Sequence, residues 1–117
     1  MKTQLRLEEL IQFVFAYLLT LRLGHDWWMF WAVILLPDIG MLGYLINTKM
    51  GAFFYNLFHH KGVALVVAAI GFYTLSDWTL FTGIILFGHS SMDRFMGYGL
   101  KYPDSFKHTH LGYIGKE

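Results

Sequence analysis

Apolar residues along this chain occur in four long runs separated by short polar segments. The runs cover residues 7–23, 27–46, 62–76 and 78–98, and the third is short unless the preceding "AFFYNLFHHK" extends it. Near-continuous apolar runs are hydrophobic on all sides, which is typical of helices that span a membrane. The pattern predicts an all-α fold, an integral membrane bundle of four transmembrane helices in a single domain. A soluble helical bundle with large apolar faces is the alternative.

Composition and charge favour the membrane interpretation. Hydrophobic residues make up 56% of the 117 residues and charged residues 15%, which is too apolar for a soluble domain of this size. Four crossings would place eight of the nine Lys and Arg residues on the side of the two termini and of the connecting segment 47–61. This asymmetry predicts that both termini are cytoplasmic. The expected partner is membrane lipid and not nucleic acid, because the scattered basic residues and the net charge of +1 form no basic patch.

Ionisable side chains lie inside the apolar runs, where they are costly unless they face an interior and pair with one another. Asp38 follows Pro37 in the second run, and the missing N–H of that proline predicts a kink beside the carboxylate. His89 and Asp93 are four residues apart in the fourth run, so their side chains share one face of a helix. Both runs therefore bring polar groups to the same cytoplasmic half of the membrane.

A pair of histidines stands at the start of the third run. Adjacent helical residues point about 100° apart, so we expect one of the two to face the centre, His60 first and His59 as its substitute. The tail adds His108 and His110, whose side chains lie on one side if the tail is extended. Imidazole and carboxylate ligands without thiolate suit zinc, manganese or iron, and the chain has no cysteine. The candidate metal ligands are Asp38, His59, His60, His89, Asp93 and His110, and the candidate catalytic residues are Asp38 and His108.

Each of these groups also has a purely structural interpretation. His89 and Asp93 could form only an interhelical hydrogen-bonded pair. His59 and His60 could be interfacial groups at a helix start, and His108 and His110 could be solvated residues of the tail. The convergence of several such groups at one depth favours a centre for a divalent metal, with zinc as the first choice.

Three stretches, "LLPDIGMLGYLIN", "YNLFHHKG" and "GLKYPDSFKHTHLGYIGK", resemble a family of small bacterial multi-pass membrane proteins known as domain of unknown function 4260. The resemblance covers nearly the full length. It implies a location in the bacterial inner membrane and implies no activity.

The motifs "LLPDI", "HHKG" and "GHSSMDRFMGYG" are also similar, in their order, to those of the YdjM-like membrane-bound metal-dependent hydrolases. That resemblance implies metal ligation by Asp38, His60, His89 and Asp93. A further histidine of the hydrolase pattern is replaced here by Leu65, so one ligand would be missing or supplied by another histidine.

The leading hypothesis is a metal-dependent hydrolase that acts on a lipid or another phosphate-bearing amphiphile at the cytoplasmic face. A spare carboxylate or His108 would serve as the general base. The first alternative is a haem-binding module with His60 and His89 as axial ligands. The second is a non-catalytic membrane subunit or small transporter in which the polar groups form an interhelical network. Four short helices enclose little volume, so a homo-oligomer is a candidate assembly.

Overall fold

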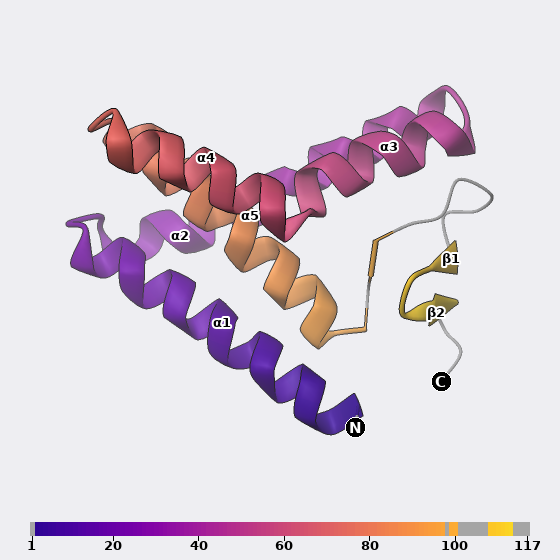
Figure 1. Ribbon diagram of the computed structural model, residues 1–117, viewed down its shortest axis with the longest axis horizontal. Helices are drawn as coiled ribbons and strands as arrows, with labels where there is room; N and C mark the ends of the chain where they lie inside the picture. The colour runs from indigo at the N-terminus through magenta and orange to yellow at the C-terminus, as the bar shows by residue number, and fades with distance from the viewer. Residues whose placement is uncertain (1, 98, 101–107, 114–117) are drawn as a thin grey trace.

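The computed structural model describes residues 2–97, 99–100 and 108–113, and it is helical over most of that length (Figure 1). In chain order the elements are α1 (Lys2–Arg22), α2 (Trp27–Val33), the 3-10 helix η1 (Leu36–Leu45), α3 (Thr48–His59), α4 (Lys61–Tyr73), α5 (Asp77–Phe95), β1 (His108–Thr109) and β2 (Gly112–Tyr113). The expected all-α class is confirmed for the body of the molecule. A two-residue antiparallel pair, in which β1 pairs with β2, was not predicted.

Three of the four predicted runs correspond to single α-helices, α1, α4 and α5, whose ends differ by a few residues from the expected ones. The second run is instead divided between α2 and η1. Pro37 at the start of η1 explains the division, because it has no N–H to donate to the preceding turn. The next N–H, that of Asp38, donates to the Leu35 carbonyl at 3.1 Å, which is the i→i+3 bond of a 3-10 helix.

Helix α3 occupies a stretch that the sequence pattern assigned to a connection. The side chain of Asn47 begins this helix by accepting a hydrogen bond from the Met50 N–H at 2.7 Å. Helix α3 packs along η1, and α4 follows it after a bend of 48° (Figure 1). Most of the expected connection is therefore a helix.

Helix α5 lies at the centre of the bundle and packs against both α1 and α4. Glycines allow α4 and α5 to approach closely: a Cβ added to Gly83 would lie 2.4 Å from the Ala68 backbone nitrogen, and one added to Gly71 would lie 2.2 Å from that of Leu80. The apolar core beside this contact includes Phe30, which is fully buried. Its buried members are Ala16, Phe30, Ile34, Phe81, Ile84 and Ile85.

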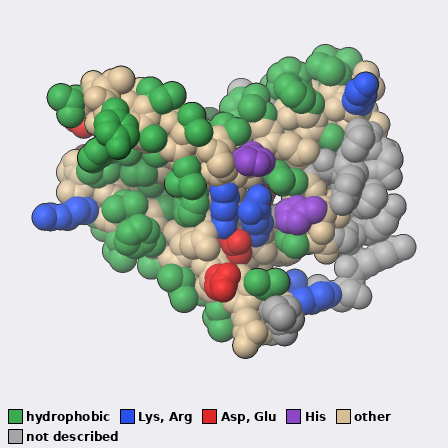
Figure 2. Space-filling model, in the orientation of Figure 1, with side chains coloured by type: hydrophobic (Ala, Val, Ile, Leu, Met, Phe, Trp, Pro, Cys, Tyr) green, Lys and Arg blue, Asp and Glu red, His purple; other side chains and the backbone are tan. Residues whose placement is uncertain are grey.

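Apolar side chains also cover much of the outer surface. Among the described helices, the stretch Trp27–Leu45 is long and apolar enough to cross a membrane, with a mean hydropathy of 1.5. Helices α3 and α4 form a second candidate span if the bent pair is treated as a single membrane-crossing segment. Only 27% of Trp27–Leu45 is buried, whereas the core helix of a soluble protein is mostly buried. Figure 2 shows hydrophobic side chains spread over both ends of one face, with a group of basic, acidic and histidine side chains near its centre and further basic side chains at its edges.

Candidate metal centre

Helix α5 positions the first two groups of the site. His89 and Asp93 lie one turn apart on its buried side, and the His89 Nε2 atom is 3.5 Å from the Asp93 Oδ2 atom. The His89 side chain is fully buried and that of Asp93 is 10% exposed. The predicted shared face of these two residues is confirmed.

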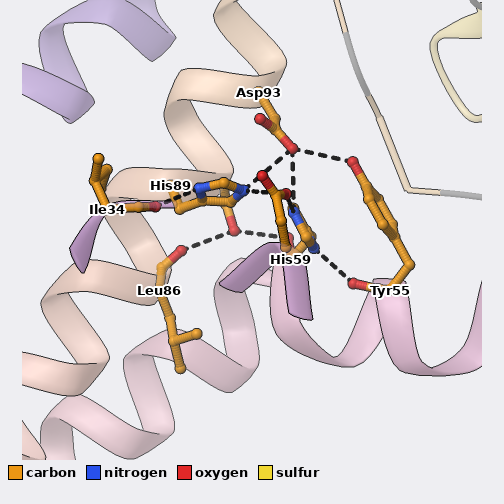
Figure 3. Close-up of polar contacts among 8 residues, drawn as sticks. Ile34, Tyr55, His59, Leu86, His89 and Asp93 are labelled. Atoms are coloured by element: carbon orange, nitrogen blue, oxygen red, sulfur yellow. Dashed lines mark hydrogen bonds and ion pairs between the residues drawn. The ribbon is translucent and has the colours of Figure 1, made fainter. Parts of the chain in front are cut away.

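The break after α2 positions the third group and also orients His89. In the i→i+3 register of η1, the partner of the Ile34 carbonyl would be the N–H of residue 37, and Pro37 has none. The ring of His89 contacts that carbonyl instead, with Nδ1 2.6 Å from the oxygen (Figure 3). On the other side of the ring, Nε2 lies 2.9 Å from Oδ1 of Asp38. The proline that interrupts the helix therefore leaves free the carbonyl that anchors the imidazole.

The fourth group is His59 and not His60, so the order of preference derived from the sequence is corrected. His59 is the last residue of α3, and its Nε2 atom lies 3.3 Å from Asp38 Oδ1 and 3.1 Å from Asp93 Oδ2. His60 has an extended conformation between α3 and α4, and its Nδ1 atom accepts a hydrogen bond from the Val63 N–H at 3.2 Å. Its ring is therefore used as the N-cap of α4.

These four residues, Asp38, His59, His89 and Asp93, form what we call the His–Asp cluster. One ligand atom from each lies within 4.8 Å of all the others. The four nitrogen-to-oxygen distances are 2.9, 3.1, 3.3 and 3.5 Å. A tetrahedral zinc ion with bonds of about 2.1 Å separates neighbouring ligand atoms by ~3.4 Å. The spacing of the cluster therefore fits one four-coordinate ion.

The hydrogen bonds around the cluster also fit a metal. The Nδ1 atoms of His59 and His89 both face backbone carbonyls, those of Tyr55 at 2.8 Å and Ile34 at 2.6 Å. Each Nδ1 must carry a hydrogen to donate, so in a neutral ring the lone pair is on Nε2 and faces a carboxylate oxygen, which is also an acceptor. A proton or a cation has to lie between these acceptors. A divalent ion satisfies both imidazoles and balances the two carboxylate charges, and histidine ligands of metals are normally anchored in this way.

Two residues that sequence reasoning missed, Tyr55 and Ser90, hold the cluster in place. The Tyr55 hydroxyl donates to Asp93 Oδ2 at 3.0 Å, and the Tyr55 ring stacks on that of His59 with centroids 3.8 Å apart (Figure 3). The Ser90 hydroxyl lies 2.8 Å from the His59 carbonyl oxygen and joins α5 to the end of α3. Tyr55 precedes His59 by one helical turn, so the four-residue spacing was the signal that could have identified it.

Burial is uneven across the cluster. The side chains of His89, His59 and Asp93 are 0%, 3% and 10% exposed, whereas that of Asp38 is 41% exposed. The Asp38 carboxylate is therefore the most exposed group of the cluster.

The remaining predicted residues lie elsewhere or outside the described part of the chain. His110 accepts a hydrogen bond on Nδ1 from the Leu100 N–H at 2.7 Å and does not belong to the His–Asp cluster. Partial burial of its ring, and then the nearby charge of Arg94, lower the pKa of His110. The backbone of His108 belongs to β1, but its side chain lies outside the described residues.

The arrangement of the two cluster histidines, His59 and His89, does not favour the haem alternative. Their ring centroids are only 4.7 Å apart, and both Nε2 atoms face the same pair of carboxylates. This arrangement suits a single ion between the rings rather than the two faces of a haem macrocycle. His60, which the haem alternative requires as an axial ligand, is the N-cap of α4.

A charged group next to the cluster ties α4 to α1. The Lys61 ammonium pairs with the Glu9 carboxylate, also contacts the Gln12 side-chain oxygen, and lies 5.2 Å from the centroid of the Phe87 ring. The side chains of Lys61 and Glu9 are each 17% exposed. The pair holds the first residue of α4, and thus the bend beside His59, against the first helix.

Comparison with known proteins places the chain in a family. The model of the family described as "Domain of unknown function (DUF4260)" matches residues 2–114. No curated protein and no solved structure matches the chain. Because the match covers nearly the whole length, the chain belongs to the DUF4260 family.

Proposed function

We propose that this DUF4260 protein holds one divalent metal ion, zinc as the first choice, in the His–Asp cluster and acts as a membrane-embedded hydrolase. The proposed substrate is a lipid or another phosphate-bearing amphiphile. The observation that carries the proposal is the donor set: two imidazoles anchored through Nδ1, and two carboxylate oxygens, with nitrogen-to-oxygen spacings of 2.9 to 3.5 Å. A bound zinc ion supplies Lewis acidity and a water molecule of lowered pKa.

The residues of the cluster divide into two groups by burial. His59, His89 and Asp93 are the buried groups that hold the ion, and they come from α3 and α5. Asp38 would be the fourth ligand of the resting site; because it lies on the exposed edge, its carboxylate could give way to a water molecule, orient it and take its proton. His108 was the other candidate for this role and stays a prediction, because its side chain is not described.

The membrane part of the proposal rests on the exposed apolar surface and on charge. Only 27% of the apolar stretch Trp27–Leu45 is buried, and eight of the nine Lys and Arg residues would share the side of both termini in a four-span topology. This asymmetry supports a bacterial inner-membrane protein with both termini cytoplasmic. The polar groups at the meeting of α3, α4 and α5 would then face the cytoplasmic half of the bilayer.

The test is hydrolysis by purified protein reconstituted in phospholipid vesicles. We expect release of phosphate or fatty acid from the zinc-loaded protein, loss of release after dialysis against a chelator, and recovery with zinc. The matched variants are His89→Ala, which should be inactive, and His25→Ala, in which the histidine lies at the other end of α5 against Trp78 and Phe81. Zinc binding without any hydrolysis across lipid and phosphoester substrates would refute the hydrolase while leaving the metal centre intact.

A second candidate function, passage of the ion across the membrane, is favoured by where the ligands lie. Asp38 follows the break between α2 and η1, and His59 precedes the bend between α3 and α4. Ion sites at interrupted helices are a recurring feature of secondary transporters. Uptake of zinc into vesicles containing the protein, and not into empty ones, would distinguish transport from hydrolysis.

A further inference from the structure

We infer that Tyr55 is a positioning residue that keeps Asp93 a one-oxygen ligand and thereby sets the centre for a four-coordinate ion such as zinc. The inference rests on the proposed metal centre and adds to it the residue that determines which class of metal is preferred. Tyr55 is 4% exposed and belongs to the middle of α3. It was not among the candidate ligands.

Tyr55 acts on two ligands through three different parts of the residue. Its hydroxyl donates to Asp93 Oδ2 at 3.0 Å, and its ring stacks on His59 with an interplanar angle of 6°. Its backbone carbonyl lies 2.8 Å from the His59 Nδ1 atom. One buried residue therefore sets the orientation of both the imidazole and the carboxylate (Figure 3).

The hydroxyl bond has a specific consequence for the coordination of Asp93. The oxygen that Tyr55 contacts, Oδ2, is also the one that faces His59 at 3.1 Å and His89 at 3.5 Å. A carboxylate that turns to present both oxygens to the ion must move Oδ2 away from its line with the hydroxyl. The close packing around a buried tyrosine prevents the ring from following that movement.

The number of ligand atoms decides which metals the cluster suits. Two imidazole nitrogens and one oxygen from each of two carboxylates make a four-coordinate set, which suits zinc and cobalt. Manganese, magnesium and calcium prefer six or more ligands, mostly oxygen. Freeing Asp93 to bind through two oxygens would raise the coordination number and reduce the preference for zinc.

The experiment compares metal binding by the wild type, Tyr55→Phe and Tyr17→Phe, purified in detergent and stripped of metal. Tyr55→Phe keeps the stacked ring and removes only the hydroxyl. Tyr17→Phe is the matched control, because its hydroxyl donates to the Trp27 carbonyl at 3.2 Å, away from the cluster. The measurements are zinc and manganese dissociation constants by competition titration, and the visible absorption spectrum with cobalt, whose intensity reports coordination number.

We expect zinc affinity to fall about 10–100-fold in Tyr55→Phe, as for other outer-shell partners of metal ligands. We expect manganese affinity to fall less, so that the ratio of the two dissociation constants changes, and the cobalt spectrum to weaken. Tyr17→Phe should match the wild type in all three measurements. Equal losses for zinc and manganese with an unchanged cobalt spectrum would overturn the inference, because a merely structural hydroxyl would produce that result.

The cobalt spectrum of the wild type is an independent check that needs no variant. The inference requires the intense bands of a four-coordinate cobalt ion, and the weak spectrum of a six-coordinate ion would overturn it. A wild type that binds neither zinc nor cobalt would instead refute the metal centre itself, so the two failures are distinguishable.

Discussion

The two carboxylates of the His–Asp cluster differ in burial, and this difference predicts how their substitution separates stability from metal binding. The Asp93 side chain is 10% exposed, and its Oδ2 atom has three partners: Tyr55 at 3.0 Å, His59 at 3.1 Å and His89 at 3.5 Å. The Asp38 side chain is 41% exposed and contacts the two histidines through Oδ1. Both carboxylates supply one oxygen to the cluster, but only one of them is held in the protein interior.

The magnitudes follow from this contrast. In the metal-free protein, Asp93→Ala leaves the buried Tyr55 hydroxyl without its acceptor and removes one of the two carboxylates that face the buried imidazoles. Breaking a buried ion pair of this kind costs about 3–5 kcal/mol. For a chain of this length, 1 kcal/mol corresponds to ~4 °C in the unfolding midpoint, so the midpoint should fall by about 12–20 °C. Asp38→Ala should cost less, about 1–3 kcal/mol, because its carboxylate is 41% exposed and Asp93 still faces both buried imidazoles. Both variants should lose more than ~100-fold in zinc affinity, since each removes a ligand and outer-shell changes alone cost 10–100-fold.

The assay is thermal unfolding in detergent with a chelator, followed by zinc titration of the same preparations. Asp26→Ala is the control, because Asp26 precedes α2 without a side-chain capping bond and lies outside the His–Asp cluster. Equal unfolding midpoints for Asp38→Ala and Asp93→Ala would refute the claim that the more buried carboxylate contributes more to stability. So would an Asp38→Ala variant that binds zinc as tightly as the wild type.

Three further predictions concern the bundle, the charge network and pH. Gly83→Ala should lower the free energy of unfolding by about 1–3 kcal/mol through overpacking, because the added Cβ would lie 2.4 Å from the Ala68 backbone. Gly88→Ala should cost less, because the nearest contacts of its Cβ would be at 3.2 Å. Equal effects of the two substitutions in thermal unfolding would contradict the close approach of α4 and α5. Lys61→Met should lower the free energy of unfolding by ~1–3 kcal/mol, between the values for exposed and buried ion pairs, since the side chains of Lys61 and Glu9 are each 17% exposed. Unfolding and zinc content measured on one sample should show this loss of stability with an unchanged zinc stoichiometry. Zinc should be released as the pH falls, because neutral imidazoles and ionised carboxylates are the metal-binding forms; a zinc titration that gives one dissociation constant from neutral to acidic pH would contradict a histidine and carboxylate site.

The local parts of the site could be predicted from the sequence because they depend on one helix or one residue. His89 and Asp93 share a face because residues four apart are neighbours on a helix, and α5 carries both as expected. Pro37 interrupts the helix of the second apolar run because it has no N–H to donate, as expected from the sequence. Neither prediction depends on which helices are neighbours in the fold.

The choice between His59 and His60 could not be made in the same way, because it depends on where α3 ends. The bend places His59 on the last turn of α3 and His60 in an extended conformation that begins α4. Helix α3 itself was not recognised, because the first part of the segment 47–61 contains Asn47 and Gly51, which are common in turns, and the segment continues with an apolar stretch that could be taken as an extension of the third run. With α3 unrecognised, Tyr55 had no predicted face and its contact with Asp93 could not be inferred.

The central claim, that the His–Asp cluster holds one metal ion, is tested most directly by elemental analysis of two adjacent histidine variants. Wild-type protein, purified without chelator, should contain one equivalent of zinc or another divalent transition metal, His59→Ala should contain none, and His60→Ala should keep the full amount. His60→Ala removes only the N-cap of α4, which costs about 1 kcal/mol, so its fold should persist. Loss of metal from His60→Ala with retention in His59→Ala, or a wild type without metal, would contradict the account.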